Sequence, residues 1–434
     1  MSRIVLATFG SLGDLHPVLA LARELHRRGH RAEIATAALY REKIAALGFV
    51  SHALRPELMV VDEALVRAIM DGPRGSERLL RGLMFPAVRD MHADLGRIVA
   101  GADLLVTSEL VYAAPLLAAQ GRARWVSYAL APLSHFSLHD PPVLPVAFGA
   151  EWLRRLPPRG VRTLLMLARL QTHGWWRPVR RLRRELGLRP GGNPLFEGKF
   201  SPLLDLALFS RAFAVPQPDW PANTVQCGFC FHDEEQAAPP LPSPVADFLA
   251  AGPPPIVFTL GSAAVFSADD FYVEAAAAAR QLNRRALLLL GKNPPPAGLP
   301  PTILAWDYLP YAQIFPHAAA IVHQGGIGTT AQALRAGRPM VVVPWAHDQP
   351  DNAARVTRLG VARTLPRRRA RADRLASALR PLLADPAVTG RAAAIAAQLR
   401  AENGPARAAD ALERALNSKN PATPAPAPPS PPPS

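Results

Sequence analysis

Two stretches in the second half of the chain carry residue types that together could bind a phosphorylated sugar. Residues 323–330 read His-Gln-Gly-Gly-Ile-Gly-Thr-Thr. A glycine-rich loop of this kind that leads into a helix can hold phosphate with backbone N–H groups and the helix dipole. Residues 344–352 follow a short apolar run and contain acid and amide side chains that suit sugar hydroxyls. The two stretches together suggest a nucleotide-sugar site.

Alternating strands and helices are expected to position these loops. Residues 3–8 read as a buried strand, 10–14 as a tight turn, 17–28 as a helix and 31–36 as a second strand. This βαβ unit predicts a doubly wound parallel sheet, in which ligands lie at the carboxyl ends of the strands. Further strands are expected at 103–107, 123–128, 204–209, 255–260, 285–290, 320–323 and 340–343, and a helix at 270–282.

The pattern divides into two such series of similar size. The expected domains are an N-terminal Rossmann-like domain over 1–215 and a C-terminal one over 251–385, which contains both candidate loops. A proline-rich interdomain linker is expected at 216–250, C-terminal helices at 386–416 and a disordered tail rich in proline at 417–434. Strand ends that face each other would place the candidate loops around one cleft.

Composition excludes several classes of function. No apolar run reaches the roughly 18 residues of a membrane span, and no signal peptide is evident, so a cytoplasmic protein is expected. The net charge of +15 comes almost entirely from arginine. It favours either a peripheral contact with an anionic membrane or an ordinary solvated basic face; no nucleic-acid-binding motif is present. Cys227 and Cys230 are expected to be reduced structural cysteines, although their spacing also suits a redox or metal site.

The chain resembles the nucleotide-sugar-dependent glycosyltransferases of family GT1, which have the GT-B fold. The motif Gly13-Asp-Leu-His-Pro17 is similar to the bacterial and sterol branch, where Gly-Asp-x-x-Pro stands in place of the plant Gly-His-x-x-Pro. Within the family, the chain looks most like the bacterial rhamnosyltransferases of mono-rhamnolipid synthesis. In the second half, the matching residues are His323, Gly325, Gly326, Gly328, Thr329, Gly337, Pro339, Pro344, Asp348, Gln349 and Asn352.

The resemblance implies an inverting hexosyltransferase that needs no metal and no cofactor beyond its nucleotide-sugar donor. An acceptor hydroxyl attacks the anomeric carbon directly, which requires a base beside the acceptor and N–H groups beside the leaving diphosphate. Asp14 stands at the family's base position. The alternative for Asp14 is a cap on the helix that is expected to begin near Pro17. His16 is the competing base, because histidine more often fills that role.

The resemblance also assigns the donor site. His323 and the N–H groups of 325–329 would hold the diphosphate, Ser262 could add a hydroxyl, and Asp348 and Gln349 would hold the sugar. Tyr308 is preferred over Trp306 for stacking on the nucleobase, although either could be core. Ala331 stands near the family's ribose-binding glutamate, which leaves the ribose contacts open. The expected donor-binding residues are Gly13, Ser262, Trp306, Tyr308, His323, Gly325, Gly326, Gly328, Thr329, Asp348, Gln349 and Asn352.

The acceptor is expected to be a hydrophobic small molecule or lipid bound by the first domain, with Glu109 lining its side of the site. A hydroxy-acyl lipid and dTDP-rhamnose follow if the rhamnolipid similarity holds, while a sterol, polyketide or phenol is the alternative acceptor. Residues 152–188, rich in arginine, leucine and tryptophan, could line that pocket, lie on a membrane or form ordinary packed helices. An epimerase acting on the nucleotide sugar and a non-catalytic partner subunit are the other hypotheses.

Overall fold

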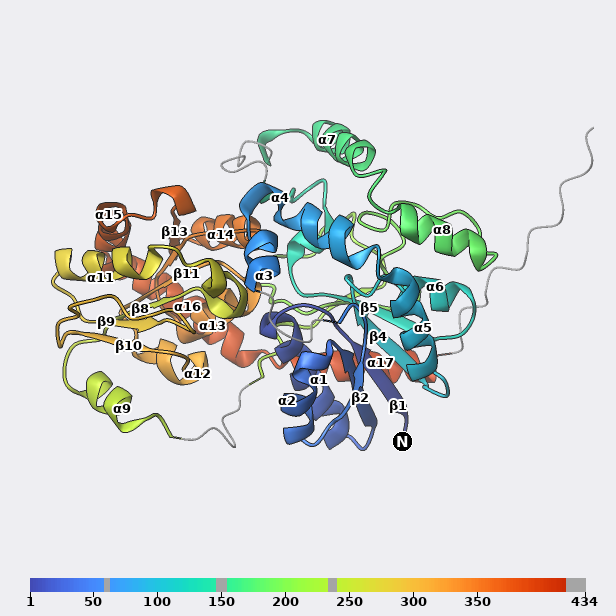
Figure 1. Cartoon of the computed structure of the whole chain (residues 1–434), viewed down its shortest axis with the longest axis horizontal. Coiled ribbons are helices and arrows are strands. Elements are labelled where there is room, and N and C mark those ends of the chain that lie inside the picture. The colour runs from blue at the N-terminus through green and yellow to red at the C-terminus, as the bar shows by residue number, and fades with distance from the viewer. Residues whose placement is uncertain (58–62, 146–153, 233–239, 419–434) are drawn as a thin grey trace, which may run out of the picture.

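The computed structural model describes residues 1–57, 63–145, 154–232 and 240–418, which form two α/β domains lying side by side (Figure 1). Each domain is built on one sheet in which all paired strands run parallel, with helices on both faces. This confirms the predicted class of two doubly wound, Rossmann-like domains.

The strand orders show where ligands can bind. The N-terminal sheet has the order β3-β2-β1-β4-β5-β6-β7 and the C-terminal sheet the order β10-β9-β8-β11-β12-β13. The direction of winding reverses between β1 and β4 and between β8 and β11, and such switch points open the crevice that binds ligands in α/β sheets. The strands are β1 (Arg3–Ala7), β2 (Arg31–Thr36), β3 (Val50–Ala53), β4 (Leu104–Ser108), β5 (Trp125–Ala129), β6 (Asp205–Ala207), β7 (Thr224–Gln226), β8 (Ile256–Thr259), β9 (Ala286–Leu289), β10 (Ile303–Trp306), β11 (Ala320–His323), β12 (Met340–Val342) and β13 (Ala362–Thr364).

Helices connect the parallel strands and cover both sheet faces. In the N-terminal half they are α1 (Leu12–Arg27), α2 (Arg41–Ala46), α3 (Glu63–Ile69), α4 (Gly72–Glu77), α5 (Val88–Ile98), α6 (Ala114–Ala119), α7 (Pro158–Gln171) and α8 (Arg177–Glu185). In the C-terminal half they are α9 (Ser243–Ala250), α10 (Gly261–Ala264), α11 (Phe271–Gln281), α12 (Tyr311–Ile314), α13 (Ile327–Ala336), α14 (Gln349–Arg358), α15 (Ala372–Ala384), α16 (Pro386–Ala401) and α17 (Gly404–Asn417). No helix in the described ranges is long and apolar enough to cross a bilayer.

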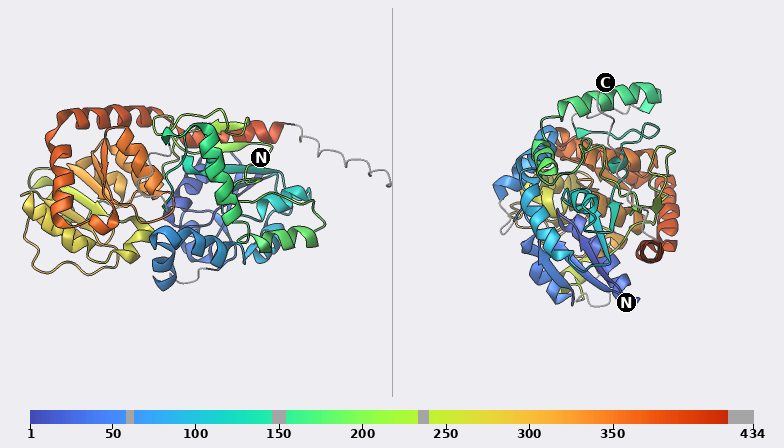
Figure 2. Two further views of the ribbon diagram at one scale, coloured as in Figure 1. Left: turned by 90° about the horizontal axis from the view of Figure 1, so that it is seen from above. Right: turned by 90° about the vertical axis from the view of Figure 1, so that its right-hand side faces the viewer.

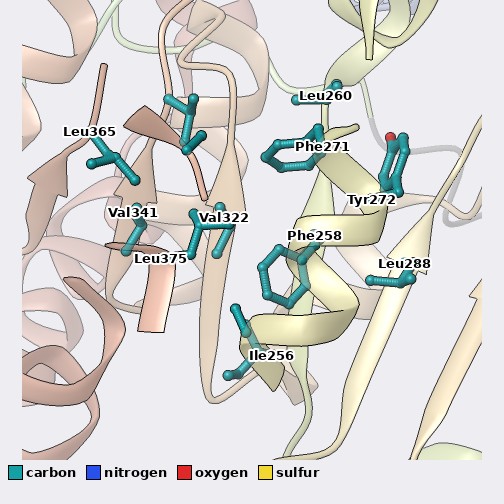
Figure 3. Packing of buried hydrophobic residues seen from close by; sticks show 14 of the residues in the cluster. Ile256, Phe258, Leu260, Phe271, Tyr272, Leu288, Val322, Val341, Leu365 and Leu375 are labelled. Carbon is teal, nitrogen blue, oxygen red and sulfur yellow. The ribbon is translucent and has the colours of Figure 1, made fainter. Parts of the chain in front are cut away.

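Each sheet separates two apolar clusters, because successive strand residues point to opposite faces. In β1, Ile4 and Leu6 enter one cluster while Val5 and Ala7 enter the other, and all four are buried. In the C-terminal domain, Phe258 packs with α11 and α15 on one face, as Figure 3 shows. These cores hold the strand ends, and therefore the loops after them, in fixed positions.

The first helix begins earlier than expected. The sequence predicts a tight turn at 10–14 and a helix from Pro17, but α1 begins at Leu12. Ser11 caps the helix: its Oγ accepts from the Gly13 N–H at 3.2 Å, and its own N–H donates to Asp14 Oδ2 at 2.7 Å. This reciprocal capping box favours an early start. Pro17 is tolerated because its φ suits a helix and its missing N–H removes one bond near the helix start.

The connection between the domains is more ordered than a plain linker. Within the predicted linker at 216–250, β7 forms the edge strand of the N-terminal sheet and α9 precedes β8. At the other end of the chain, α17 leaves the C-terminal domain and packs on α1 of the first domain (Figure 2). Arg28 fixes α17 there by ion pairs to Asp410 at 2.6 Å and Glu413 at 2.8 Å. Cys227 and Cys230 are buried and unbridged in this region.

Candidate active site

Two helix N-termini from different domains meet at the site. A Cβ added at Gly328, in the first turn of α13, would lie 3.6 Å from the Cα of Gly13, in the first turn of α1. The N-cap of α13 is Gly326, and no side chain caps this end of the helix. Its first N–H groups therefore remain available to an anion. The uncapped N-terminus of α13 suits a diphosphate, whereas the N-terminus of α1 is closed by its own capping box.

Asp14 lies at this junction as the third residue of α1. Its Oδ2 accepts hydrogen bonds from the Ser11 N–H at 2.7 Å and the Ser11 Oγ at 3.2 Å. Gly10 makes room for this carboxylate, since a Cβ there would lie 2.2 Å from Oδ2, and its φ of +142° suits glycine. Burial, helped by the charge of nearby Glu109 and opposed by the hydrogen bonds from Ser11, raises the pKa of Asp14 to about 6. The carboxylate therefore caps the helix while remaining partly exposed.

Glu109 follows β4 and is held in an ionic cluster. Lys199 Nζ donates to Glu109 Oε2 at 3.1 Å and Ser134 Oγ donates to Oε1 at 2.8 Å. Although burial opposes ionisation, Lys199 and Ser134 keep the pKa of Glu109 below its usual value. Lys199 is itself buried and lies 4.8 Å from the centre of the Phe136 ring. Glu109 is thus a charge held near Asp14, at the N-terminal switch point.

His16, the second candidate base, has a different environment. Its ring lies 5.4 Å from the ring of His232, a buried residue of the segment that leads to the C-terminal domain. Residues two apart on a helix do not face the same way. His16 therefore does not share the Ser11 environment of Asp14.

His323 ends β11 and is fully buried. Its Nδ1 accepts a hydrogen bond from the Gly325 N–H at 3.0 Å, and burial lowers its pKa to about 3. A neutral imidazole that accepts at Nδ1 carries its proton on Nε2. Nε2 has no hydrogen-bond partner among the described residues. His323 thus presents a free N–H donor beside the glycine-rich loop.

Packing explains the glycines of this loop. A Cβ on Gly325, whose φ is +91°, would lie 2.7 Å from Val342 Cγ1, and one on Gly326 would lie 2.8 Å from Gln324 Nε2. The Gln324 amide also reaches Thr329 Oγ1 at 3.4 Å. The predicted strand, loop and helix are therefore present. The positive φ and close packing exclude a Cβ at Gly325, whereas at Gly326 the Gln324 side chain would have to move.

Asn352 joins the glycine-rich loop to the loop after β12. Its Nδ2 donates to the Gly325 carbonyl at 2.9 Å and to Asp348 Oδ2 at 2.6 Å. Asn352 is fully buried, so it orients both loops from behind. Burial, helped by the charge of Asp14 in the other domain and opposed by the hydrogen bond from Asn352, raises the pKa of Asp348 to about 7. The carboxylates of Asp14 and Asp348 therefore repel each other electrostatically across the domain boundary.

Gln349 also holds a loop in place. Its Oε1 accepts from the backbone N–H groups of Trp345 at 2.7 Å and Ala346 at 3.1 Å, and the residue is buried. The amide oxygen is thereby committed to the backbone of the loop that carries Asp348. Contact between Gln349 and a sugar stays a prediction.

The remaining expected donor residues lie at the carboxyl edge of the C-terminal sheet. Ser262 is exposed on α10, directly after β8. Trp306 ends β10 and packs partly in the core, whereas the Tyr308 side chain is 54% exposed. Three strand spacings, about 14 Å, separate β10 from β11. An extended ligand could therefore span both strand ends, and the choice between Trp306 and Tyr308 stays open.

Tyr311 was not foreseen from the sequence. Its hydroxyl lies 2.8 Å from Thr259 Oγ1 at the end of β8, and it also interacts with Thr329 of the glycine-rich helix. No local motif marks this role, because the tyrosine meets these partners only through the sheet topology.

The N-terminal domain docks onto the loop that carries Asp348. Met70, next to α3, is buried within the C-terminal core cluster. Ser76 Oγ of α4 lies 3.0 Å from His347 Nδ1, and burial lowers the pKa of His347 to about 4. The two domains therefore share an apolar and a polar contact beside the candidate site.

A buried ionic network also crosses the boundary. Arg355 of α14 donates through Nε to Asp351 Oδ2 at 2.7 Å and through Nη1 to Asp140 of the N-terminal domain. Asp351 Oδ1 accepts from the Val143 N–H at 3.1 Å. Arg355 is 2% exposed, so the charges are desolvated and depend on one another. Because α14 also carries Asn352, this network fixes the N-terminal domain relative to the donor loops.

No group of three or more potential metal ligands occurs within the described ranges. The charged side chains at the site are instead carboxylates held by hydrogen-bond donors and by Lys199.

Comparison with known protein families matches both halves of the chain. Residues 4–81 match the glycosyltransferase family 28 N-terminal domain. Residues 288–415 match the C-terminal domain of proteins similar to erythromycin biosynthesis protein CIII. One match lies in each of the two domains that meet at the site.

Similar proteins match over nearly the full length. The O-mycaminosyltylonolide 6-deoxyallosyltransferase of Streptomyces fradiae is 33% identical over 418 residues, covering 93% of this chain and 94% of that protein. The structure of the glycotransferase of kitacinnamycin has a TM-score of 0.71 at 24% identity, covering 96% of this chain and 99% of that one. The structure of the spinosyn rhamnosyltransferase SpnG with thymidine diphosphate has a TM-score of 0.63 at 16% identity. The match covers 95% of this chain and 100% of that one.

Proposed function

The chain belongs to the GT1 glycosyltransferases of the GT-B fold, and on that premise we propose that it transfers a hexose from a thymidine-diphosphate sugar to a polyketide-type hydroxyl. The observation that carries this proposal is the meeting of the α1 and α13 N-termini at Gly13 and Gly328, with Asp14 on one side and His323 on the other.

The leaving diphosphate is placed at the uncapped N-terminus of α13. The uncapped N–H groups of α13 and the Nε2–H of His323 donate to its oxygens, and they gain strength as negative charge develops. Trp306 or Tyr308, at the end of β10, stacks on the nucleobase. Ser262 supplies a hydroxyl from the neighbouring strand end.

The proposed reaction is one displacement at the anomeric carbon. The acceptor oxygen forms its bond to that carbon while the bond from the carbon to the diphosphate oxygen breaks, and the nucleoside diphosphate leaves with the bonding electrons. Asp14 takes the acceptor proton; with a pKa of about 6 it is ionised at neutral pH and more basic than an ordinary carboxylate. Glu109 maintains negative charge beside it, and Asp348 holds the sugar hydroxyls.

The acceptor class rests on the relatives. The protein from Streptomyces fradiae bears the name of a transferase acting on a macrolide and using a 6-deoxy sugar, which supports a polyketide acceptor and a deoxyhexose donor. The rhamnolipid-type acceptor expected from the sequence receives no support from the relatives reported above. It stays a second candidate, to be decided by the acceptors offered in the assay.

The test is a transfer assay with purified protein and mass detection. Thymidine- and uridine-diphosphate sugars are each offered with macrolactones, hydroxy-acyl lipids, sterols and phenols, with and without a chelator. A sugar mass added to a macrolactone supports the proposal, and addition only to a lipid favours the second candidate. Absence of donor binding by calorimetry would overturn both.

A further inference from the structure

A basic and apolar surface stands apart from the candidate active site. Residues 154–191 contain eleven arginines and one acidic residue, Glu185, and so account for most of the net charge of +15. They form α7 and α8, which follow one another along the chain, with α7 at the top of Figure 1 and α8 lower on its right-hand side. Neither helix supplies a residue to the site described above.

Helix α7 exposes large apolar side chains to solvent. Only Val161 of its fourteen residues is fully buried. Met166, Leu167 and Leu170 are 55%, 56% and 68% exposed. Met166 and Leu167 lie four and three residues before Leu170, so the three share one side of the helix. Four of the nine large apolar residues exposed in the described part of the chain lie on α7.

Arginines accompany this apolar face. Arg159 and Arg162 lie on α7 and have no acidic partner among the described residues. Arg169 pairs with Glu197 at 3.4 Å and lies over the Phe196 ring, which ties the end of the helix to the domain. The helix is therefore anchored at its C-terminal end and presents cations beside its apolar stripe.

Helix α8, the start of α5 and residues 188–191 line an open cavity of about 990 Å³. Its lining includes Arg89, Arg177, Arg180, Arg181, Arg183 and Arg184. Glu185 pairs with Arg89 and, at 3.0 Å, with Arg181, which leaves the cavity with an excess of cations. Burial lowers the pKa of Arg183, so its charge would gain from an anion. Guanidinium groups arranged in this way suit phosphate oxygens.

We propose that α7 and α8 dock the protein on an anionic phospholipid surface, with Met166, Leu167 and Leu170 entering the acyl boundary and the α8 arginines binding lipid phosphates. A nucleic acid would use the arginines and leave the apolar face in water. An anionic bilayer would contact the arginines and the apolar face at the same time, because it offers phosphate groups next to hydrocarbon. The proposal is independent of the sugar-transfer reaction.

The experiment is sedimentation of the full-length protein with vesicles of phosphatidylcholine alone or with phosphatidylglycerol. The Leu167→Gln/Leu170→Gln and Arg180→Gln/Arg184→Gln proteins are compared with the control variants Val273→Gln and Arg374→Gln. The controls alter an exposed valine of α11 and an exposed arginine of α15. Thermal unfolding establishes that each variant is folded.

The proposal predicts binding to the anionic vesicles alone, weakened about tenfold or more by each test variant, unchanged in the controls and reduced by salt. Equal binding to neutral vesicles, or equal loss in the controls, would overturn it. If the protein binds a DNA duplex through the same arginines and binds no vesicles, the partner is a nucleic acid and the proposal is wrong. Full competition by glycerol phosphate, with no effect of the leucine changes, would indicate a soluble phosphate ligand instead.

Discussion

Gly13 and Gly328 belong to different domains, yet a methyl group on Gly328 would lie only 3.6 Å from the Gly13 Cα. This approach brings the first turns of α1 and α13 together and still leaves ordinary packing distance for a methyl group on Gly328. In our account, the diphosphate of the donor binds beside this junction, at the uncapped N-terminus of α13.

The Gly328→Ala substitution tests whether the donor diphosphate binds next to this junction. A contact of 3.6 Å is ordinary packing, and alanine favours a helix by about 1 kcal/mol over glycine. We therefore expect an unchanged or raised melting temperature but about tenfold weaker thymidine diphosphate binding by calorimetry, since the methyl group enters the diphosphate path. Gly390→Ala, in the open middle of α16, is the control. Unchanged affinity in Gly328→Ala would place the diphosphate elsewhere.

Two substitutions of His323 test the roles of its two ring nitrogens separately. Asparagine can accept from the Gly325 N–H but has no donor at the position of Nε2, so we expect retained stability and nucleotide affinity lowered about 10- to 100-fold. Glutamine keeps a donor near Nε2 and leaves the Gly325 N–H unpaired. It should retain affinity within a few-fold and lose about 1–3 kcal/mol of stability. Calorimetry and denaturant unfolding measure both; the reverse pattern would contradict the assigned tautomer.

Asp348 links stability to pH. Burial raises its pKa to about 7, above its unfolded value near 4, so folding favours the protonated acid. This contribution is complete below about pH 4 and is lost as the pH rises through 7. Asp348→Asn should therefore be about 1–2 kcal/mol more stable relative to wild type at pH 8 than at pH 4, after allowance for solvent screening. Asp373→Asn, with an exposed carboxylate, is the control; a pH-independent difference for Asp348→Asn would refute the prediction.

The ionic network between the domains predicts strong coupling. Arg355→Met leaves Asp351 and Asp140 without their shared cation and should cost about 3–5 kcal/mol of stability. Asp140→Asn should lower the stability by less, because Arg355 keeps its ion pair with Asp351. A double-mutant cycle by denaturant unfolding measures the coupling. The exposed Arg371–Glu274 pair should give less than about 1 kcal/mol. Equal coupling in both pairs would contradict the role of the network.

Local sequence patterns predicted the parts of the site that are local in the chain. Apolar runs located β1, β8, β11 and β12, and the glycine spacing placed the loop at the start of α13, because strand and loop chemistry act over a few residues. The start of α1 was wrong, since the capping box of Ser11 and Asp14 outweighs Pro17 as a boundary signal.

Local sequence patterns could not predict contacts between segments that are distant in the chain. Nothing near Asn352 indicates that its amide would bridge Gly325 and Asp348, and nothing near Arg355 indicates its pairing with Asp140. The return of α17 to α1 depends likewise on Arg28 meeting Asp410 and Glu413, far along the chain. These contacts exist only once both sheets have formed and the domains have docked.

The most direct test of the account is sugar transfer by Asp14→Asn. Asparagine retains an oxygen to accept from the Ser11 N–H but cannot take a proton, so kcat/KM should fall by about 10²- to 10⁴-fold at unchanged donor affinity. In the wild type, kcat/KM should fall about tenfold per pH unit below 6 as Asp14 becomes protonated. Transfer by Asp14→Asn at the wild-type rate, with His16→Ala inactive, would contradict Asp14 as the base and assign that role to His16.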